Sequence, residues 1–254
     1  MSELQKKIAR ILRREGPAIG FGARTREIPK AMLLAATATN ESGARAAIEA
    51  GADAIVLRGE SPSALTSAIH ALSKDKITVG AWLTSLDEAG AEALAKAGCD
   101  FVISTLDGTT SAAVNPERMG QLLVVGVDGF DDTTLRSLGP LGLDGLFIDR
   151  QGGAMTLKDQ LALVRLASFS STQLVVTVEG GASVSDLRVL RDSGTAAVVA
   201  REGATAGQIK ALIEALKAVP APKKGKEGRE IALVPSVAAA QAAEEDGEDN
   251  DWDE

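Results

Sequence analysis

EAGADAIVLR, residues 49–58, is a unit of sequence that returns three more times along the chain. In each copy a glycine ends a helical segment, a short turn follows, and an apolar run has the character of a buried strand. Glycine suits the left-handed conformation that ends many helices. The other copies are KAGCDFVIST (96–105), LGLDGLFIDR (141–150) and DSGTAAVVAR (192–201).

Around these units, apolar runs alternate with helical segments such as LDEAGAEALAKA (86–97). Such alternation predicts parallel strands joined by right-handed crossovers. Eight strand–helix units over about 190 residues predict an α/β protein with a compact (β/α)8 TIM barrel. A doubly wound open sheet is the alternative, but it would usually have a glycine-rich fingerprint after its first strand, and AATATNESG (35–43) is not one. The predicted strands are 33–38, 54–58, 77–83, 101–105, 122–128, 145–149, 174–179 and 196–201.

The composition supports this division of the 254 residues into three parts. Residues 1–30 are predicted to form an N-terminal helix (2–15, with Ser2 as its N-cap) and a lead-in whose segment 18–23 lies at the bottom of the barrel. Residues 31–219 form the barrel. Residues 220–254 are a flexible linker and acidic tail, in which an apolar patch (231–237) and Trp252 offer a contact for a protein partner.

Charge and hydropathy exclude several classes of partner. The tail holds 4 of the 27 basic and 10 of the 35 acidic residues, which leaves 23 basic and 25 acidic residues elsewhere. This near-neutral body offers no broad basic surface for nucleic acid. No apolar run reaches the roughly 18 residues of a membrane span, and residues 1–16 are unlike a signal peptide, so we expect a cytoplasmic protein.

Active sites of such barrels lie at the C-terminal ends of the strands. Strand ends would be polar in any barrel, and neighbours such as Asp149 and Arg150 point in opposite directions. We expect three carboxylates to be candidates for acid–base catalysis: Glu179 first, then Asp128 and Asp149. Arg58 and Thr37 are the predicted substrate contacts. The other residues at the predicted strand ends are Thr39, Glu60, Trp82, Thr84, Ser104, Thr105, Arg201 and Glu202.

The stretch VTVEGGASVSDL (176–187) adds a candidate anion site. Its glycines, Gly180 and Gly181, let backbone N–H groups approach a ligand after the seventh strand. The next loop, Arg201-Glu202-Gly203, leads into a helix whose N-terminus favours anions. We therefore predict a phosphate site across these two loops; the plainer reading is a tight turn with Ser183 or Ser185 as N-cap.

The same stretch resembles the phosphate-binding TIM-barrel superfamily. The likeness is close over 174–216 and architectural elsewhere, with local similarity to indole-3-glycerol-phosphate synthase and thiamine-phosphate synthase. By that resemblance Glu179 faces the substrate, while Gly181 and the Arg201–Gly203 loop hold phosphate. The chain departs from the synthase because its early strands, LLAATAT and ITVGAWL, lack the catalytic lysines. No predicted strand carries a lysine, so Schiff-base chemistry has no nucleophile.

Two cofactors, Mg²⁺ and a flavin, are compatible with the predicted mouth. The carboxylates can bind Mg²⁺ together with a substrate phosphate, and flavin mononucleotide (FMN) is a further option, but no residue is assigned as a metal ligand. The single histidine, His70, lies on a predicted outer helix, and the single cysteine, Cys99, is expected to pack as a small hydrophobe. The leading hypothesis is a lyase or isomerase of a small phosphorylated molecule. The alternatives are a non-catalytic barrel that binds or assembles through its acidic tail, and an FMN-binding barrel.

Overall fold

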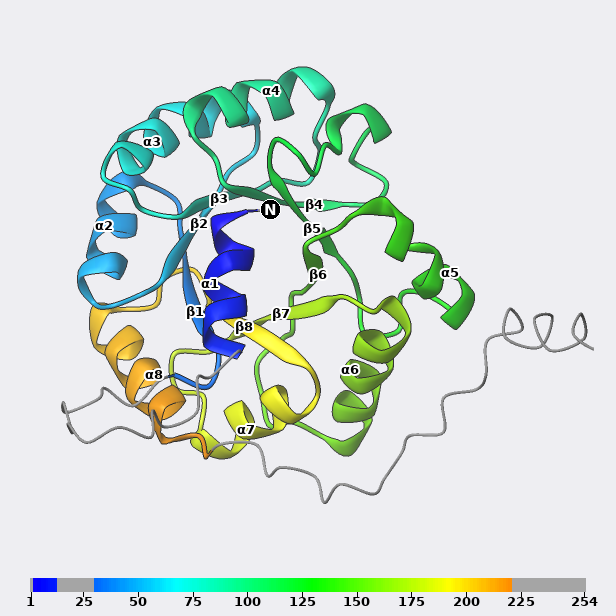
Figure 1. Ribbon diagram of the computed structural model, residues 1–254. Helices are drawn as coiled ribbons and strands as arrows, with labels where there is room; N and C mark the ends of the chain where they lie inside the picture. Colours follow the sequence, from blue (N-terminus) through cyan, green and yellow to red (C-terminus); the bar gives the residue numbers. More distant parts are fainter. Residues whose placement is uncertain (1, 13–29, 221–254) are drawn as a thin grey trace, which may run out of the picture. The chain divides into compact units, whose positions relative to one another are not determined.

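Eight parallel strands pair in sequence order in the computed structural model, which describes residues 2–12 and 30–220, and β1 pairs with β8 to close a barrel (Figure 1). The closed order confirms the predicted (β/α)8 barrel and excludes the open sheet. The strands are β1 (Leu33–Ala38), β2 (Ala54–Arg58), β3 (Val79–Trp82), β4 (Phe101–Thr105), β5 (Gly120–Val124), β6 (Gly145–Ile148), β7 (Gln173–Val178) and β8 (Thr195–Ala200).

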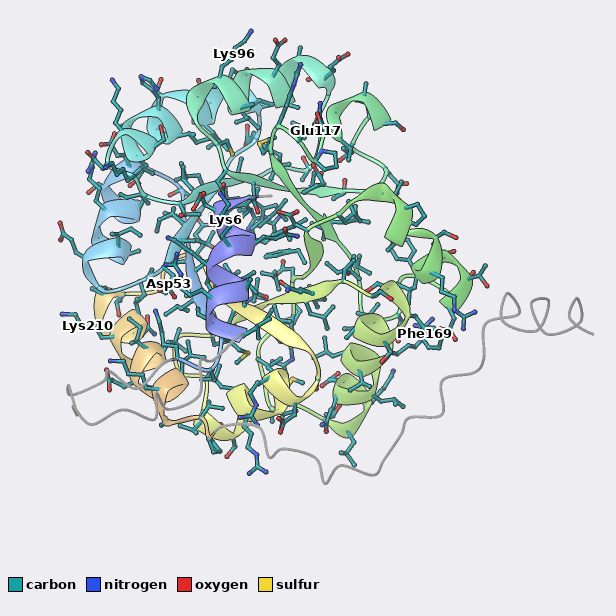
Figure 2. The ribbon with its side chains drawn as sticks, viewed as in Figure 1. Lys6, Asp53, Lys96, Glu117, Phe169 and Lys210 are labelled. Carbon is teal, nitrogen blue, oxygen red and sulfur yellow. The ribbon has the colours of Figure 1, made fainter. Side chains whose placement is uncertain are left out.

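Helices surround the barrel and cover its outer face (Figure 1). Their outward side chains, such as Lys96 and Lys210, extend away from the strands (Figure 2). The α-helices are α1 (Glu3–Leu12), α2 (Glu41–Glu49), α3 (Pro62–Lys74), α4 (Glu88–Ala97), α5 (Asp132–Ser137), α6 (Leu157–Ser170), α7 (Val184–Asp192) and α8 (Ala206–Ala218), and two 3-10 turns are η1 (Ser111–Ala113) and η2 (Gly139–Leu141).

The strands are buried on both faces, so two apolar cores form. One lies between the strands and the outer helices. The other fills the barrel with residues that alternate along each strand, such as Leu33 and Ala35 of β1 and Phe101 and Ile103 of β4. The small side chains of β1 and β8 leave room in this interior for the bulky Phe101 and Phe147.

The repeated sequence unit has the predicted geometry. Gly98 caps α4 in the left-handed conformation, with a φ of 91°. The equivalent glycines of the other three units also have positive φ values, at Gly51, Gly142 and Gly194. Each therefore turns the chain out of a helical segment and into the next strand.

The N-terminal helix α1 lies across one end of the barrel (Figure 1). Leu4 and Ile8 are buried and join the interior core. The backbone amides of Glu3 and Leu4 donate to the carboxylate of Asp100, at 2.7 and 2.8 Å, and Gln5 N–H donates to Ser2 Oγ, as predicted for an N-cap. Because Asp100 immediately precedes β4, α1 closes the N-terminal end of the barrel, opposite the expected active-site mouth.

Two strands differ from prediction by more than one residue at an end. The third strand is shorter than predicted, and the fifth begins at Gly120 and ends at Val124 where the sequence pattern placed it at 122–128. The chain leaves β5 through a turn in which Gly129 N–H donates to Gly126 O at 3.0 Å. Asp128 is therefore an exposed turn residue and does not end a strand.

Two segments of the predicted organisation, the lead-in at 18–23 and the tail at 220–254 beyond its first residue, lie outside the described residues. Of the helices that are described, none is long and apolar enough to cross a membrane.

Candidate functional site

The C-terminal mouth of the barrel is lined by side chains that continue the interior face of the strands. Leu33 and Ala35 point into the barrel, so Thr37 at the end of β1 shares that face. By the same alternation Arg58 follows Val56 on β2, and Arg201 follows Val199 on β8. The mouth therefore brings together the predicted residues Thr37, Arg58 and Arg201.

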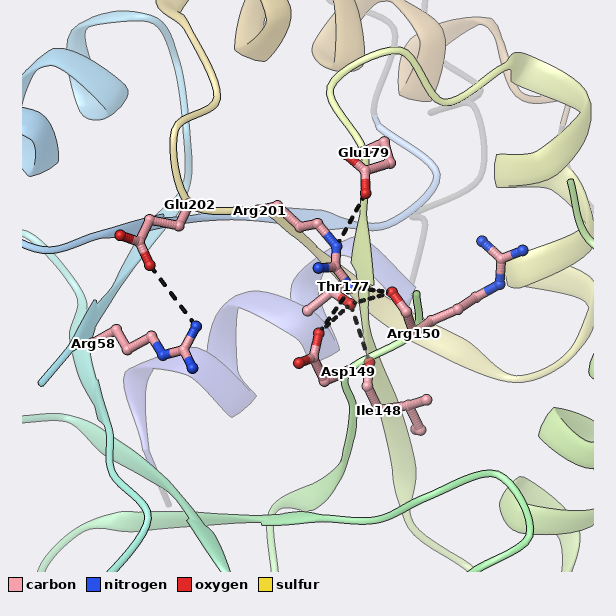
Figure 3. Close-up of polar contacts among 8 residues, drawn as sticks. All are labelled: Arg58, Ile148, Asp149, Arg150, Thr177, Glu179, Arg201 and Glu202. Atoms are coloured by element: carbon pink, nitrogen blue, oxygen red, sulfur yellow. Dashed lines mark hydrogen bonds and ion pairs between the residues drawn. The ribbon is translucent and has the colours of Figure 1, made fainter. Parts of the chain in front are cut away.

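Arg201 is held by two carboxylates (Figure 3). Its Nη2 lies 3.0 Å from Asp149 Oδ1, and its Nε lies 3.2 Å from Glu179 Oε1. Thr177 Oγ1 donates to the same Asp149 oxygen at 3.1 Å, which fixes the carboxylate against β7. The side chains of Arg201 and Asp149 are about two-thirds buried, whereas that of Glu179 is 55% exposed. Glu179 is thus the carboxylate that can most easily move away from Arg201.

Asp149 and Arg150 do point in opposite directions, as the strand geometry requires. Asp149 faces Arg201, while the Arg150 guanidinium donates to Gly153 O at 2.7 Å and lies away from the mouth (Figure 3). Asp128 makes no side-chain hydrogen bond or ion pair within the described part of the chain. Of the three predicted carboxylates, the structure brings Glu179 and Asp149 together and leaves Asp128 apart.

A second arginine crosses the mouth from β2. The Arg58 guanidinium carbon lies 4.7 Å from the centroid of the Trp82 ring, a cation–π contact. Its Nη1 is 3.8 Å from Glu202 Oε2. Trp82 in turn meets the edge of Phe147 inside the barrel, with 4.8 Å between ring centroids. Nothing in the sequence pattern indicated the stacking of Arg58 on Trp82, because it joins two strands through side-chain conformation.

The two glycine-bearing loops form tight turns. Ala182 N–H donates to Glu179 O at 3.1 Å, and Ala204 N–H donates to Arg201 O at 3.2 Å. The amides of Gly181 and Gly203 have no hydrogen-bond partner among the described residues. A Cβ on Gly180 would lie 2.7 Å from Gln208, so the first turn packs directly on the first turn of α8. The loops are therefore neighbours, as a shared anion site requires.

Side chains already cap both helices that follow these loops. Ser183 accepts a hydrogen bond from Asp186 N–H at the start of α7, which confirms one of the two predicted N-caps. Thr205 and Gln208 form a capping box on α8. The cap on α7 satisfies the amide of Asp186, and the capping box on α8 satisfies the amides of Thr205 and Gln208, which leaves the amides of Gly181 and Gly203 in the preceding loops uncapped. The plain structural role and the anion-binding role are thus compatible in this geometry.

The other reactive residue types lie elsewhere. His70 is exposed on α3, as predicted for an outer helix. Cys99 is buried beside β4, where burial raises the pKa of its thiol to about 12, and its Sγ donates to Phe101 O. Within the described ranges, no three His, Cys, Asp or Glu side chains converge on a point that could hold a metal ion. Two small hollows, one beside α4 and one beside the N-terminus of α1, lie away from the mouth.

No protein-family model matches the sequence, and no curated protein is significantly similar to it. Solved structures share the fold. One is tryptophan synthase from M. tuberculosis, which is 14% identical, with 86% of this chain and 98% of that chain covered and a TM-score of 0.60. Another is KGPDC from Streptococcus mutans, solved as a complex, which is 16% identical, with 75% of this chain and 99% of that chain covered and a TM-score of 0.58. A mutant tryptophan synthase alpha-subunit from Pyrococcus furiosus is 11% identical, with 74% of this chain and 98% of that chain covered and a TM-score of 0.57. At these identities the likeness establishes the barrel fold.

Proposed function

We propose that the protein is a phosphate-binding barrel that acts on a small phosphorylated molecule. The observation that carries this proposal is the adjacent pair of turns after β7 and β8. The amides of Gly181 and Gly203 are without partners in the described chain, and the N-termini of α7 and α8 follow directly. Unpaired amides at helix N-termini attract anions. The fold is shared with phosphate-binding barrel enzymes, tryptophan synthase alpha and KGPDC, which supports a phosphorylated ligand as the first to test.

Within this proposal the reaction is that of a lyase or isomerase that uses a carboxylate base. Neither the strands nor the loops at the mouth contain lysine or histidine, which leaves carboxylates as the groups able to move a proton. Glu179 is the best base because it is exposed beside Arg201 and free to turn toward a substrate. Asp149, fixed by Arg201 and Thr177, serves to position the arginine.

A non-catalytic binding barrel is the second candidate, and one observation favours it. Both mouth arginines are neutralised by carboxylates of the same chain, Arg201 by Asp149 and Glu179 and Arg58 by Glu202. A mouth that satisfies its own charges needs no substrate to be stable. In this case the acidic tail would supply the contact with a protein partner, and Mg²⁺ or FMN would have no role.

A charge placed in the turn after β7 tests the phosphate site. Gly181 is exposed, and a Cβ there meets nothing within 4 Å, so Gly181→Asp fits without a clash. Gly139, in η2 at the opposite end of the barrel, is equally exposed and open, which makes Gly139→Asp a matched control. With ethyl phosphate at a hundredfold excess over its Kd, we expect stabilisation of about 2.7 kcal/mol in the wild type, or roughly 5–10 °C in Tm.

The expected result is that Gly181→Asp loses this stabilisation and Gly139→Asp keeps it. Equal stabilisation of both variants, or none of the wild type at millimolar ethyl phosphate, rejects the phosphate site. Native mass spectrometry of the purified full chain, with an absorbance spectrum, separates the alternatives: a yellow sample with a bound mass indicates FMN.

A further inference from the structure

Two buried polar atoms at the mouth lack hydrogen-bond partners among the described residues. One is the hydroxyl oxygen of Thr37, a residue that is only 8% exposed. The other is Arg201 Nε, which is 3.2 Å from Glu179 Oε1 but is not aligned with it for a hydrogen bond. A buried hydroxyl without a partner is costly, and at the mouth of the barrel it is placed to donate a hydrogen bond to a bound ligand.

The two atoms lie at the C-terminal ends of neighbouring strands, Thr37 in β1 and Arg201 directly after β8, and face the same way. The β1–β8 register pairs Ala36 with Ala200, so Thr37 lies beside Arg201 one residue further on. Both follow interior residues, Ala35 and Val199, and therefore point into the mouth. We call the place between these two side chains the Thr37–Arg201 seam. A ligand oxygen there could accept hydrogen bonds from the Thr37 hydroxyl and the Arg201 guanidinium together.

The charges define what that ligand group is. Arg201 carries one positive charge against the two negative charges of Asp149 and Glu179. A further anion would be repelled unless one carboxylate leaves, and Glu179 is the exposed one. A carboxylate that replaces Glu179 leaves the net charge of the cluster unchanged and has the planar shape that a guanidinium binds.

We propose that the ligand carries a carboxylate that displaces Glu179 from Arg201 and accepts a hydrogen bond from Thr37. Joined to the proposed function, on which this extension rests, the ligand class is a small phosphorylated carboxylic acid. Its phosphate lies on the amides of Gly181 and Gly203, and its carboxylate lies at the Thr37–Arg201 seam. Glu179 occupies the place of that carboxylate when the ligand is absent.

Substitution of Thr37 gives the sharpest test, with 2-phosphoglycolate as the probe and ethyl phosphate as the same ester without a carboxylate. Thr37→Val removes the hydroxyl and keeps the shape. Thr195 is matched to it: its Oγ1 is also buried without a partner in the described chain, but it lies at the N-terminal end of β8. Calorimetric titration of the full chain should show about tenfold weaker binding of 2-phosphoglycolate to Thr37→Val. Thr37→Ser and Thr195→Val should bind as the wild type does.

Removal of the competing carboxylate gives the opposite effect. Glu179→Ala should bind 2-phosphoglycolate several-fold more tightly than the wild type, because nothing needs to leave Arg201. Unchanged affinity in both Thr37→Val and Glu179→Ala overturns the inference, as does wild-type affinity for 2-phosphoglycolate no greater than for ethyl phosphate.

The melting temperature of Thr37→Val should equal or exceed that of the wild type, because the lost hydroxyl has no hydrogen-bond partner among the described residues. The phosphate site is tested separately. If 2-phosphoglycolate binds wild type and Gly181→Asp equally, and ethyl phosphate does not bind, the phosphate site is rejected while the carboxylate site at Thr37 and Arg201 remains.

Discussion

Replacement of Asp100 by alanine should loosen the N-terminal end of the barrel and leave the mouth intact. Asp100 accepts the amides of Glu3 and Leu4, 97 and 96 residues away in sequence, at 2.8 Å or less. Loss of a helix N-cap costs about 1 kcal/mol, up to about 2. A carboxylate at a helix N-terminus adds about 0.3–1 kcal/mol. The expected loss is therefore about 2 kcal/mol.

That loss should appear both globally and in α1. For a domain of this size, about 2 kcal/mol corresponds to a fall of roughly 4–8 °C in Tm. A helix of 10 residues is not stable alone, so weaker docking lets α1 open without the barrel. Hydrogen exchange in α1 should then accelerate by up to about thirtyfold, the factor that corresponds to about 2 kcal/mol. Asp100→Asn, which keeps one acceptor oxygen, should have an intermediate effect.

Asp107→Ala is the control, since Asp107 follows the same strand and is exposed, with no side-chain hydrogen bond in the described chain. An Asp100→Ala protein with wild-type Tm and wild-type exchange in α1 would show that the burial of Leu4 and Ile8 alone docks the helix. The reasoning that assigns about 2 kcal/mol to the cap would then be wrong.

Three further predictions follow from buried groups. Gly80→Ala places a Cβ 2.3 Å from the Phe101 ring and should destabilise by about 1–3 kcal/mol in denaturant titration; Phe101→Leu in the same chain should recover part of the loss, and additive losses would contradict the clash. Cys99, whose pKa is raised by burial from 9.0 to about 12, should resist a thiol reagent at about pH 8 until the protein unfolds; labelling at the rate of a free thiol would refute its burial. Burial also raises the pKa of Asp144 in the folded state. The folded state therefore binds a proton on this carboxyl more tightly than the unfolded state does, and protonation adds to the free energy of unfolding as pH falls through the folded-state pKa. Asp144→Asn should therefore be at least as stable as the wild type at neutral pH, and the difference should close in acid. The free energy of unfolding measured against pH checks this. A variant that is much less stable at neutral pH would show that the hydrogen bond from Ser2 outweighs the cost of desolvation.

The barrel was predictable because its signals are local. A glycine that ends a helix and an apolar run that follows it are written within ten residues, as in 49–58. Four copies of the same unit fix the alternation of elements, and closure follows from the number of strands. The boundary of β5 was not predictable in the same way, because VGVDGF continues an apolar pattern while its glycines form a turn.

The aspartate of the repeated unit shows what cannot be predicted from the local sequence. Asp53, Asp100 and Asp144 occupy the same place in three copies, two residues after the glycine. All three lie at the N-terminal end of the barrel, where Asp53 binds Lys30 and Leu34 N–H, Asp100 caps α1 and Asp144 accepts from Ser2. The repeat identifies the position, but the partners come from segments up to 142 residues away. Only the folded chain supplies them.

The mouth poses the same problem with a different consequence. The sequence placed Arg58, Asp149, Glu179 and Arg201 at strand ends, but which carboxylate pairs with which arginine depends on side-chain conformation. The pairs found here do not argue against an anionic ligand. An ion pair to a carboxylate as exposed as Glu179 is worth about 0–1 kcal/mol after screening by solvent. The need to break this ion pair therefore lowers the affinity for a competing anion by no more than about fivefold. The paired hydrogen bonds that a bound carboxylate makes with the guanidinium would contribute more than this loss.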